Sequence, residues 1–376
     1  MSKHKISKVV LTGGPCGGKT TAMAFLKRKF EDKGYRVIVV PEAATLCING
    51  GLSPVNPSIG PEIGQRAILS TICGLEAAWD EAANKLSEKS PVLQLCDRGI
   101  PDIDAYVPRR MYKKILAEKG LNLVQVRDER YHVVLHLVTA ALGAEGDYTT
   151  SNNGARYEKD PRQAFLMDHK LVGAWMGAPH WRAIDNSTDF NGKIRRVYQE
   201  ICRALGIPVP VERERKYLVT LNPRKLPKDA QRISIEQIYT PSPDITMVRR
   251  LRRRGQHGYF TFYETLKQST LVPGENLEIE RFISEEEYRA GSRSMFAYTG
   301  PIIKTRTCFA YNFQYFELDK FEDKRAVGDG KYLLELEITD KRRRVDLPPY
   351  IKVEREVTGD PNFSNFNIAR RVVSTT

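Results

Sequence analysis

The sequence has 376 residues, of which 41% are hydrophobic and 9% aromatic. This length and composition suit two globular domains and exclude a disordered chain. The net charge of +13 favours an acidic partner, such as a nucleic acid, a phosphorylated small molecule or an anionic membrane surface. No apolar run approaches the length of a membrane span, so we expect any membrane contact to be peripheral.

The cysteines and the first residues indicate a compartment. The six cysteines form no Cys-x-x-Cys pair, which favours reduced thiols over a disulfide framework. The chain begins with Met-Ser-Lys-His-Lys and has no apolar secretory segment there. We therefore expect a cytoplasmic protein that can also lie peripherally at a membrane.

A glycine-rich loop follows the first predicted strand, residues 8–11, and opens an amphipathic helix over residues 22–33. It satisfies the pattern Gly-x-x-x-x-Gly-Lys-Ser/Thr in the strand-loop-helix context that gives the pattern its meaning. Backbone N–H groups and the helix N-terminus are expected to hold the phosphates of GTP or ATP, with Lys19 on the terminal phosphates and Thr20 on Mg²⁺. The predicted nucleotide-binding residues are Gly13, Gly14, Pro15, Cys16, Gly17, Gly18, Lys19, Thr20 and Thr21.

Further strands are predicted at residues 35–40, 92–96, 133–138 and 181–186, with helices over residues 61–87 and 190–205. The second strand ends at Pro41-Glu42 and the third at Asp97-Arg98-Gly99. An acid in the position of Asp97 can hold Mg²⁺ through water or act as a general base toward a phosphoryl acceptor. The alternative is a capping residue in a strand-to-helix turn. Asp97 and Arg98 are candidate catalytic residues, and Asp97 is also a candidate metal ligand.

The polar segment over residues 144–161 shows little periodicity. Arg156 and Arg162 flank its Tyr-Glu-Lys-Asp sequence, and in a lid they would stabilise charge on a transferring phosphoryl group. The alternative is an ordinary solvated loop. We count both arginines as candidate catalytic residues.

Strands that alternate with helices after a phosphate-binding loop predict an α/β domain with a parallel sheet over residues 1–209. The loop, Pro41-Glu42, Asp97-Arg98-Gly99 and the arginine-bearing segment resemble the nucleotide- and nucleoside-kinase branch of P-loop proteins. More narrowly, they resemble the kinase-like domain shared by the bifunctional nicotinamide-riboside kinase regulator and the TRPL translocation defect family.

Residues 210–376 change to β-forming and turn residues, with eight or nine short predicted strands that favour an antiparallel barrel or sandwich. The first strand reads Val211-Glu212-Arg213-Glu214-Arg215-Lys216. Because side chains alternate along a strand, Glu212, Glu214 and Lys216 share one face. Further i, i+2 pairs of like charge follow, namely Arg250 and Arg252, Glu278 and Glu280, Lys304 and Arg306, Glu317 and Asp319, and Glu335 and Glu337. Buried charges need partners, so these faces are either a solvated outer surface or a charge-lined lumen.

This order of motifs, with Thr265-Leu266-Lys267 and Val357-Thr358-Gly359-Asp360, resembles the CYTH domain of the triphosphate tunnel metalloenzymes. The resemblance implies an eight-stranded tunnel in which basic residues bind a polyphosphate and carboxylates hold Mg²⁺ or Mn²⁺. The implied phosphate-binding residues are Lys216, Arg250, Arg252, Lys267, Lys304 and Arg306. The implied metal-side residues are Glu212, Glu214, Glu278, Glu280, Asp319, Glu335 and Glu337. The turn over residues 255–259 looks longer than usual, which leaves the register of Arg250 and Arg252 open.

The two domains in this order resemble the TRPL translocation defect family of small GTP-binding proteins that bind acidic phospholipids in membrane-protein trafficking. A nucleotide-binding regulatory protein with a phosphorylated ligand, such as a phospholipid headgroup, in the tunnel is therefore the first hypothesis. The alternatives are a metal-dependent triphosphatase in the tunnel and a small-molecule kinase in the P-loop domain. The basic run Lys341–Arg344 is a solvated loop or a lipid contact. Nucleic acid is disfavoured because no recognised module is present.

Overall fold

The computed structural model describes residues 4–144, 160–207, 211–338 and 344–373, apart from the side chains of residues 211 and 212. By their contacts the residues divide into two compact units, Met1–Ile201 and Cys202–Thr376, and each is described by itself. The junction at residues 209 and 210 stays a prediction. Within the described ranges, no helix combines the length and apolarity needed to cross a membrane.

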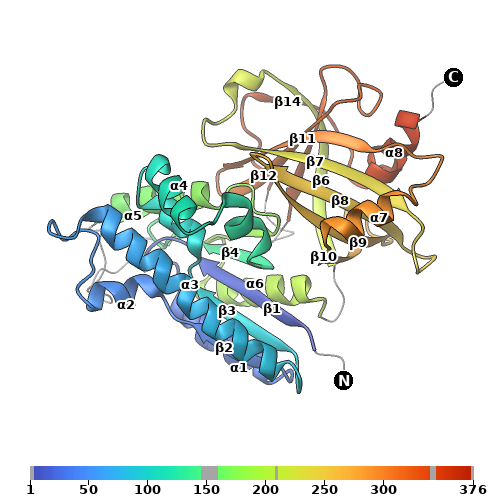
Figure 1. Ribbon diagram of the computed structural model, residues 1–376. Helices are drawn as coiled ribbons and strands as arrows, with labels where there is room; N and C mark the ends of the chain where they lie inside the picture. The colour runs from blue at the N-terminus through green and yellow to red at the C-terminus, as the bar shows by residue number, and fades with distance from the viewer. Residues whose placement is uncertain (1–3, 145–159, 208–210, 339–343, 374–376) are drawn as a thin grey trace. The chain divides into compact units, whose positions relative to one another are not determined.

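The first unit is built on a five-stranded parallel sheet (Figure 1). Its strands are β1 (Ile6–Thr12), β2 (Arg36–Val40), β3 (Val92–Asp97), β4 (Val133–Leu137) and β5 (Trp181–Ile184), in the order β2-β3-β1-β4-β5. All five residues of β4 are buried, as are the last six of β1. Such continuous burial is expected of parallel strands covered on both faces. The predicted α/β parallel sheet is confirmed.

Helices and short turns connect these strands. They are α1 (Lys19–Glu31), α2 (Ala43–Asn49), α3 (Gly60–Leu86), η1 (Ile100–Ala105), α4 (Arg109–Glu118), η2 (Gln125–Glu129), α5 (Pro161–Ala174) and α6 (Phe190–Leu205). The sequence predicted α1, α3 and α6 but gave no prediction for α2, α4 or α5. Helix α4 is short and highly charged, and it buries Tyr112, Ile115 and Leu116, with Met111 packed beside them. A helix of ten residues offers little periodicity to detect.

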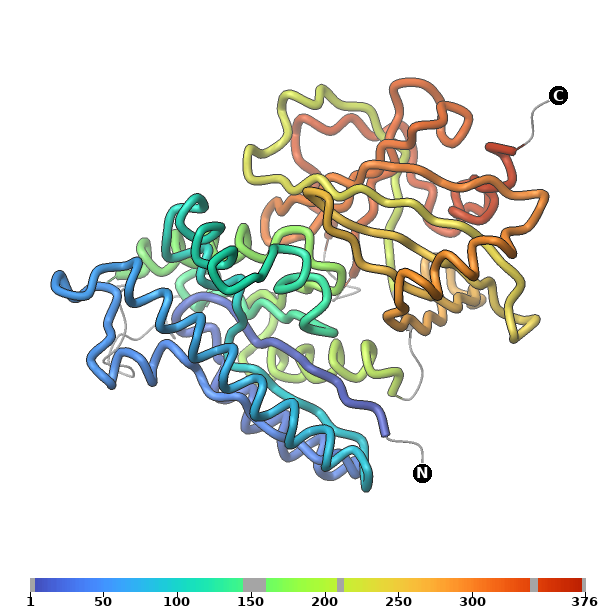
Figure 2. Tube along the Cα trace, viewed as in Figure 1, coloured from blue at the N-terminus to red at the C-terminus, as the bar shows by residue number. Residues whose placement is uncertain are grey.

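The second unit is an antiparallel sheet that closes on itself. Its strands are β6 (Val211–Leu221), β7 (Gln231–Thr240), β8 (Val248–Gln256), β9 (Tyr259–Ser269), β10 (Glu275–Phe282), β11 (Ile302–Tyr311), β12 (Gln314–Phe321), β13 (Tyr332–Glu337) and β14 (Ile351–Glu356). Strand β6 pairs with β13 on one side, and on the other it pairs first with β10 and then with β14. The path of the chain around this ring can be followed in Figure 2. Closure by β6 and β10 makes β6–β13 an eight-stranded barrel with β14 appended, which confirms the predicted barrel.

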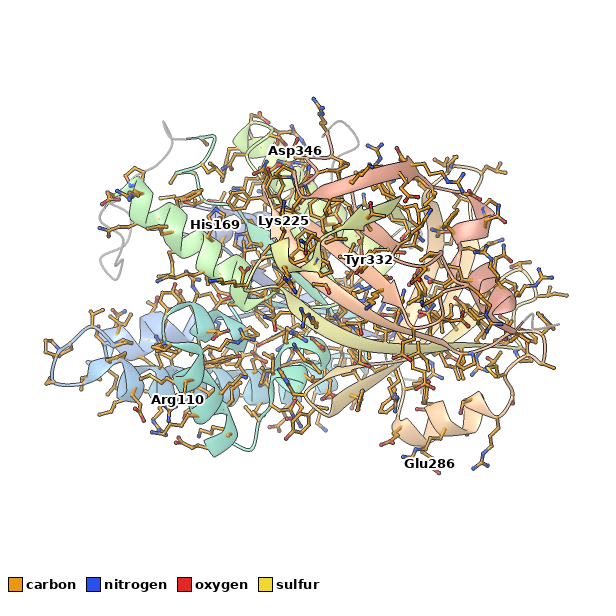
Figure 3. The ribbon with its side chains drawn as sticks, turned by 90° about the horizontal axis from the view of Figure 1, so that it is seen from above. Arg110, His169, Lys225, Glu286, Tyr332 and Asp346 are labelled. Atoms are coloured by element: carbon orange, nitrogen blue, oxygen red, sulfur yellow. The ribbon has the colours of Figure 1, made fainter. Side chains whose placement is uncertain are left out.

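Helix α7 (Glu285–Ser292) packs against β7, β8 and β9. It begins with a capping box in which Ser284 and Glu287 satisfy each other's backbone N–H groups. Helix α8 (Asn365–Val373) packs against β7 and β11, and the 3₁₀ turns η4 (Pro223–Lys225) and η5 (Pro361–Phe363) complete the unit. Figure 3 draws the side chains, and Arg110 of α4, His169 of α5 and Glu286 of α7, which it labels, are exposed.

The hairpin of β8 and β9 corrects one expectation. Gln256 pairs with Tyr259, so the connecting loop has only two residues, His257 and Gly258, which both have positive φ. This is the geometry of a type I′ turn, whose twist matches the flanking strands. The turn is therefore not long, and the register is defined, with Arg250 opposite Thr265 and Arg252 opposite Tyr263.

Candidate functional site

The phosphate-binding loop connects β1 to α1. Gly13 and Gly18 have φ of 127° and 89°, and a Cβ atom on Gly13 would lie 2.1 Å from the carbonyl oxygen of Leu137. Only glycine therefore allows this backbone path. Lys19 Nζ donates to the carbonyl oxygens of Gly13 and Gly14 at 3.0 and 3.1 Å. The amino group thus lies over the hollow that the loop encloses.

Acidic and basic side chains meet Lys19 at the ends of β2 and β3. Burial lowers the pKa of Lys19, and the guanidinium of Arg98 adds to that effect, while Asp97 and Glu42 oppose it. Arg98 has a positive φ of 72°, and its Nε donates to Glu42 at 2.5 Å. A non-glycine residue held in this region stores backbone strain. This backbone conformation places the guanidinium near Lys19 of the loop.

Asp97 and Thr20 supply oxygen atoms next to Lys19. Burial raises the pKa of Asp97, and its Oδ1 atom is buried with no hydrogen-bond partner among the described residues. An orphaned carboxylate oxygen beside a phosphate-binding loop fits a hard cation such as Mg²⁺. These two residues could therefore hold the metal ion of a bound nucleoside triphosphate.

Asp102 of η1 is a residue that the sequence did not single out. Its Oδ1 accepts from Thr12 Oγ1 at 2.7 Å and from Trp175 Nε1 at 2.5 Å, and its Oδ2 accepts from Arg98 at 3.2 Å. Asp102 and Glu42 therefore hold Arg98 from two sides. No spacing in the sequence indicates this arrangement, because Thr12, Glu42 and Trp175 are all distant from Asp102 along the chain.

Asp168 of α5 is a second residue that the sequence missed. Its Oδ1 accepts from the backbone N–H of Gly14 at 2.6 Å and lies 3.1 Å from Nε2 of His136. Although burial opposes the shift, His136 and the Gly14 N–H lower the pKa of Asp168. Asp168 thus joins α5 to the phosphate-binding loop, and His136 is fully buried beside it.

The loop opens into a cavity of about 560 Å³. It is lined by residues of the loop, of α2 and of the strand ends, and by Gln65, Ile68 and Ile72 of α3 and Ile103 of η1. Phe190, the first residue of α6, also lines it. Of the candidate lid arginines, Arg156 lies outside the described residues, and Arg162 is exposed in the first turn of α5.

The barrel interior holds a first network of charges on β6, β11, β12 and β13. Lys304 Nζ lies 2.5 Å from Asp319, and Arg306 lies 2.7 Å from the same carboxylate and 2.6 Å from Glu335. Glu335 is in turn 2.9 Å from Lys216. These side chains are almost fully buried, and each has an opposite charge, which buried ions require.

A second network lies on β8, β9 and β10. Arg250 is 3.2 Å from Glu278 and 3.5 Å from Glu280, and Lys267 is 2.9 Å from Glu278. Arg252 is held less closely, with Glu280 at 3.9 Å and no hydrogen-bond partner for its Nε among the described residues. Burial lowers the pKa of Arg252, and Arg250 lowers it further. An anion between the two guanidinium groups would relieve that repulsion.

The alternating charges therefore face a lumen and not an outer surface. The two networks bring together all six predicted phosphate-binding residues, Lys216, Arg250, Arg252, Lys267, Lys304 and Arg306. They also include the predicted metal-side residues Glu214, Glu278, Glu280, Asp319 and Glu335. Glu337 is half-buried on the same face of β13, and the side chain of Glu212 is outside the described residues. Two lumen residues were not proposed as site residues: Glu317, which pairs with Arg306, and the buried Arg254.

Where side chains are described, the lumen carboxylates pair with cations, and no group of three or more His, Cys, Asp or Glu gathers in a geometry that could hold a metal ion. The binding of Mg²⁺ or Mn²⁺ in the lumen stays a prediction. Most of the basic run Lys341–Arg344 also lies outside the described residues, so its contact with lipid is untested.

Comparisons with known proteins match each unit separately. A family model described as an AAA domain matches residues 8–193, from β1 into α6. No curated protein matches the chain. Among solved structures, the inorganic triphosphatase NE1496 matches at 25% sequence identity over 42% of this chain and 94% of its own, with a TM-score of 0.31. A second structure, described as the hypothetical protein NE1496, matches with the same identity and TM-score and 97% of its own chain covered.

Proposed function

We propose that this protein is a nucleotide-binding regulatory protein with two separate phosphate sites. The P-loop unit binds GTP or ATP with Mg²⁺, and the barrel lumen binds a second phosphorylated ligand. The family match and the geometry around Lys19 support nucleotide binding by the first unit. The observation that carries the second site concerns two neighbouring arginines in the lumen. Arg250 lowers the pKa of Arg252, and the carboxylate of Glu280 lies 3.9 Å from Arg252.

The identity of the lumen ligand is the finer part of this proposal. Resemblance to the TRPL translocation defect family favours an acidic phospholipid headgroup and a role in membrane-protein trafficking. The net charge of +13 is compatible with an anionic membrane surface, since each basic residue near such a surface contributes about 1 kcal/mol. A soluble organic phosphate would use the same cations.

The test measures binding of GTP, ATP and a soluble phosphoinositide headgroup by calorimetry. Lys19→Ala should abolish nucleotide binding by the P-loop unit. Lys27→Ala, on the exposed face of α1, should leave that binding unchanged. Arg252→Ala should weaken headgroup binding at least tenfold, and the control Arg253→Ala removes a partly exposed arginine that pairs with Glu236. Equal effects of the two arginine changes would contradict a lumen site, and intact nucleotide binding in Lys19→Ala would contradict the P-loop assignment.

A second candidate is a small-molecule kinase in the P-loop unit. Gln65 is 5% exposed and lines the cavity. A polar side chain in the wall of a cavity favours a polar ligand there. Asp97 would accept the proton of an attacking hydroxyl group. Nucleoside diphosphate release that never exceeds the blank across a screen of hydroxyl compounds would remove this candidate.

A triphosphatase in the lumen is the third candidate, favoured by the number of carboxylates beside the cations. In that case the lumen should release phosphate from inorganic triphosphate with Mg²⁺ or Mn²⁺. Glu214→Gln should lower the rate, whereas Lys19→Ala should not. Absence of metal-dependent release by the wild type would reject it.

A further inference from the structure

An exposed aromatic ring lies against the phosphate-binding loop. The four phenylalanines of the first unit are all described, and Phe190 is the one whose side chain is exposed, at 44%. Its ring contacts the loop closely, since a Cβ atom on Gly18 would lie 2.7 Å from Cε2 of Phe190. Apart from these contacts, Phe190 has no stacking partner among the described aromatic side chains. A large apolar ring at the rim of a polar cavity is therefore left accessible to a ligand.

The position of Phe190 along the cavity decides which part of a nucleotide it can meet. Lys19 and the acids at the ends of β2 and β3 mark the side of the terminal phosphate. In a loop of this kind the backbone N–H groups hold the inner phosphates, so the nucleoside leaves on the side away from Asp97 and Glu42. Phe190 packs on Gly18, just before Lys19. It is the first residue of α6 and directly follows the β5–α6 connection, so it does not come from α2, α3 or η1.

The connection that carries Phe190 is held in place. Asn186 Nδ2 donates to the carbonyl oxygens of Thr139 and Leu142 at 2.8 and 2.6 Å, and Lys193 Nζ donates to Asn186 Oδ1 at 2.7 Å. Asp189 Oδ1 accepts from Gly192 N–H at 2.8 Å and so caps the start of α6. A ring carried by a fixed backbone loses little conformational freedom when a planar group stacks on it.

From these observations we propose that Phe190 is the nucleobase-binding residue of the P-loop site, on which the base of GTP or ATP stacks. The inference rests on the proposed nucleotide binding and adds the residue that recognises the nucleoside. Stacking uses the π face that every base presents, so Phe190 contributes to both nucleotides and does not choose between them. It makes no contribution to a ligand that has phosphates but no base.

The experiment compares GTP, ATP and inorganic triphosphate on the full-length protein, with binding that survives in Lys19→Ala assigned to the lumen and subtracted. Phe190→Ala should weaken GTP and ATP about tenfold and leave triphosphate affinity within twofold. Phe190→Leu keeps apolar packing on Gly18 without an aromatic face and should lose nucleotide affinity like Phe190→Ala. Phe190→Trp should retain affinity.

Fluorescence distinguishes stacking on residue 190 from a purely structural role of that residue. The added emission of Phe190→Trp should be quenched by GTP and ATP but not by triphosphate, and the double variant with Lys19→Ala should show no such quenching. Equal weakening of all three ligands, or unchanged nucleotide affinity in Phe190→Ala, would overturn the inference. Absence of any Lys19-dependent binding by the wild type would instead reject the proposed nucleotide site.

Discussion

At the residue scale, the loop residues around Lys19 could be predicted because they are contiguous and their pattern implies one backbone path. Asp102 and Asp168 could not, because each acts through partners distant in sequence: Asp102 joins Thr12 to Trp175, and Asp168 reaches Gly14. These contacts form only when the fold brings the partners together. Their contribution to the free energy of unfolding can be measured at Asp102.

Asp102→Ala should destabilise the first unit by about 2–4 kcal/mol, since it leaves the buried donors of Thr12 and Trp175 without their acceptor. It also removes one of the two carboxylates that hold the guanidinium of Arg98, which keeps Glu42. Asp102→Asn should cost less because it keeps one acceptor oxygen. All three tryptophans, Trp79, Trp175 and Trp181, lie in this unit, so urea unfolding followed by their fluorescence reports its stability. A change below about 1 kcal/mol in the free energy of unfolding of the alanine variant would show that the hydrogen bonds of Asp102 do not stabilise this unit.

Lys304 gives the lumen a predicted pH dependence. Burial lowers the pKa of Lys304 to about 8, although Asp319 opposes the shift. A depressed lysine pKa means that positive charge is present below about pH 8 and is lost as the pH rises through that value. Triphosphate affinity of the lumen should therefore fall between about pH 7 and 9, apart from any upward shift of the pKa that the bound anion causes.

The matched variant is Lys304→Arg, which stays charged over this range. Calorimetric titrations of inorganic triphosphate in the Lys19→Ala background should show a pH-dependent loss in the parent that is flattened in Lys304→Arg. Ionisation of the ligand itself cancels in this comparison. Parallel pH profiles of the two proteins would exclude Lys304 as the titrating group.

At the scale of elements, charge alternation predicted the lumen strands because one side chain in two faces the interior. The hairpin of β8 and β9 was misjudged because its turn uses His257 in a conformation that favours Asn or Gly. The short loop also brings Gly255 close to the other strand, and the two glycines of this hairpin serve different purposes.

Gly258→Ala should cost about 1 kcal/mol, because φ is +83° and a Cβ atom would meet nothing within 4 Å. Gly255→Ala should cost more, about 3 kcal/mol, because its Cβ atom would lie 2.1 Å from the carbonyl oxygen of Tyr259. Urea unfolding followed by far-ultraviolet circular dichroism should rank the two variants in this order. A larger loss in Gly258→Ala would mean that the hairpin has another register.

At the scale of the whole molecule, the sequence predicted both architectures because each has its own periodicity, strand-helix alternation in one unit and short charged strands in the other. It did not predict α2, α4, α5, α7 or α8, which are helices that pack against other elements of their units. In the proposed function the two units share a ligand chemistry, since each would present buried cations to a phosphate.

Two independent phosphate sites make a prediction about unfolding. A ligand that binds only the folded state at a concentration of 100 times its Kd stabilises that state by about 2.7 kcal/mol. ATP with Mg²⁺ should therefore raise the stability reported by tryptophan fluorescence, and Lys19→Ala should remove this gain. Inorganic triphosphate should raise the stability of the barrel, followed by far-ultraviolet circular dichroism, in Lys19→Ala but not in Arg250→Ala. If Arg250→Ala removed both gains, a single site would bind both ligands and the two-site proposal would be wrong.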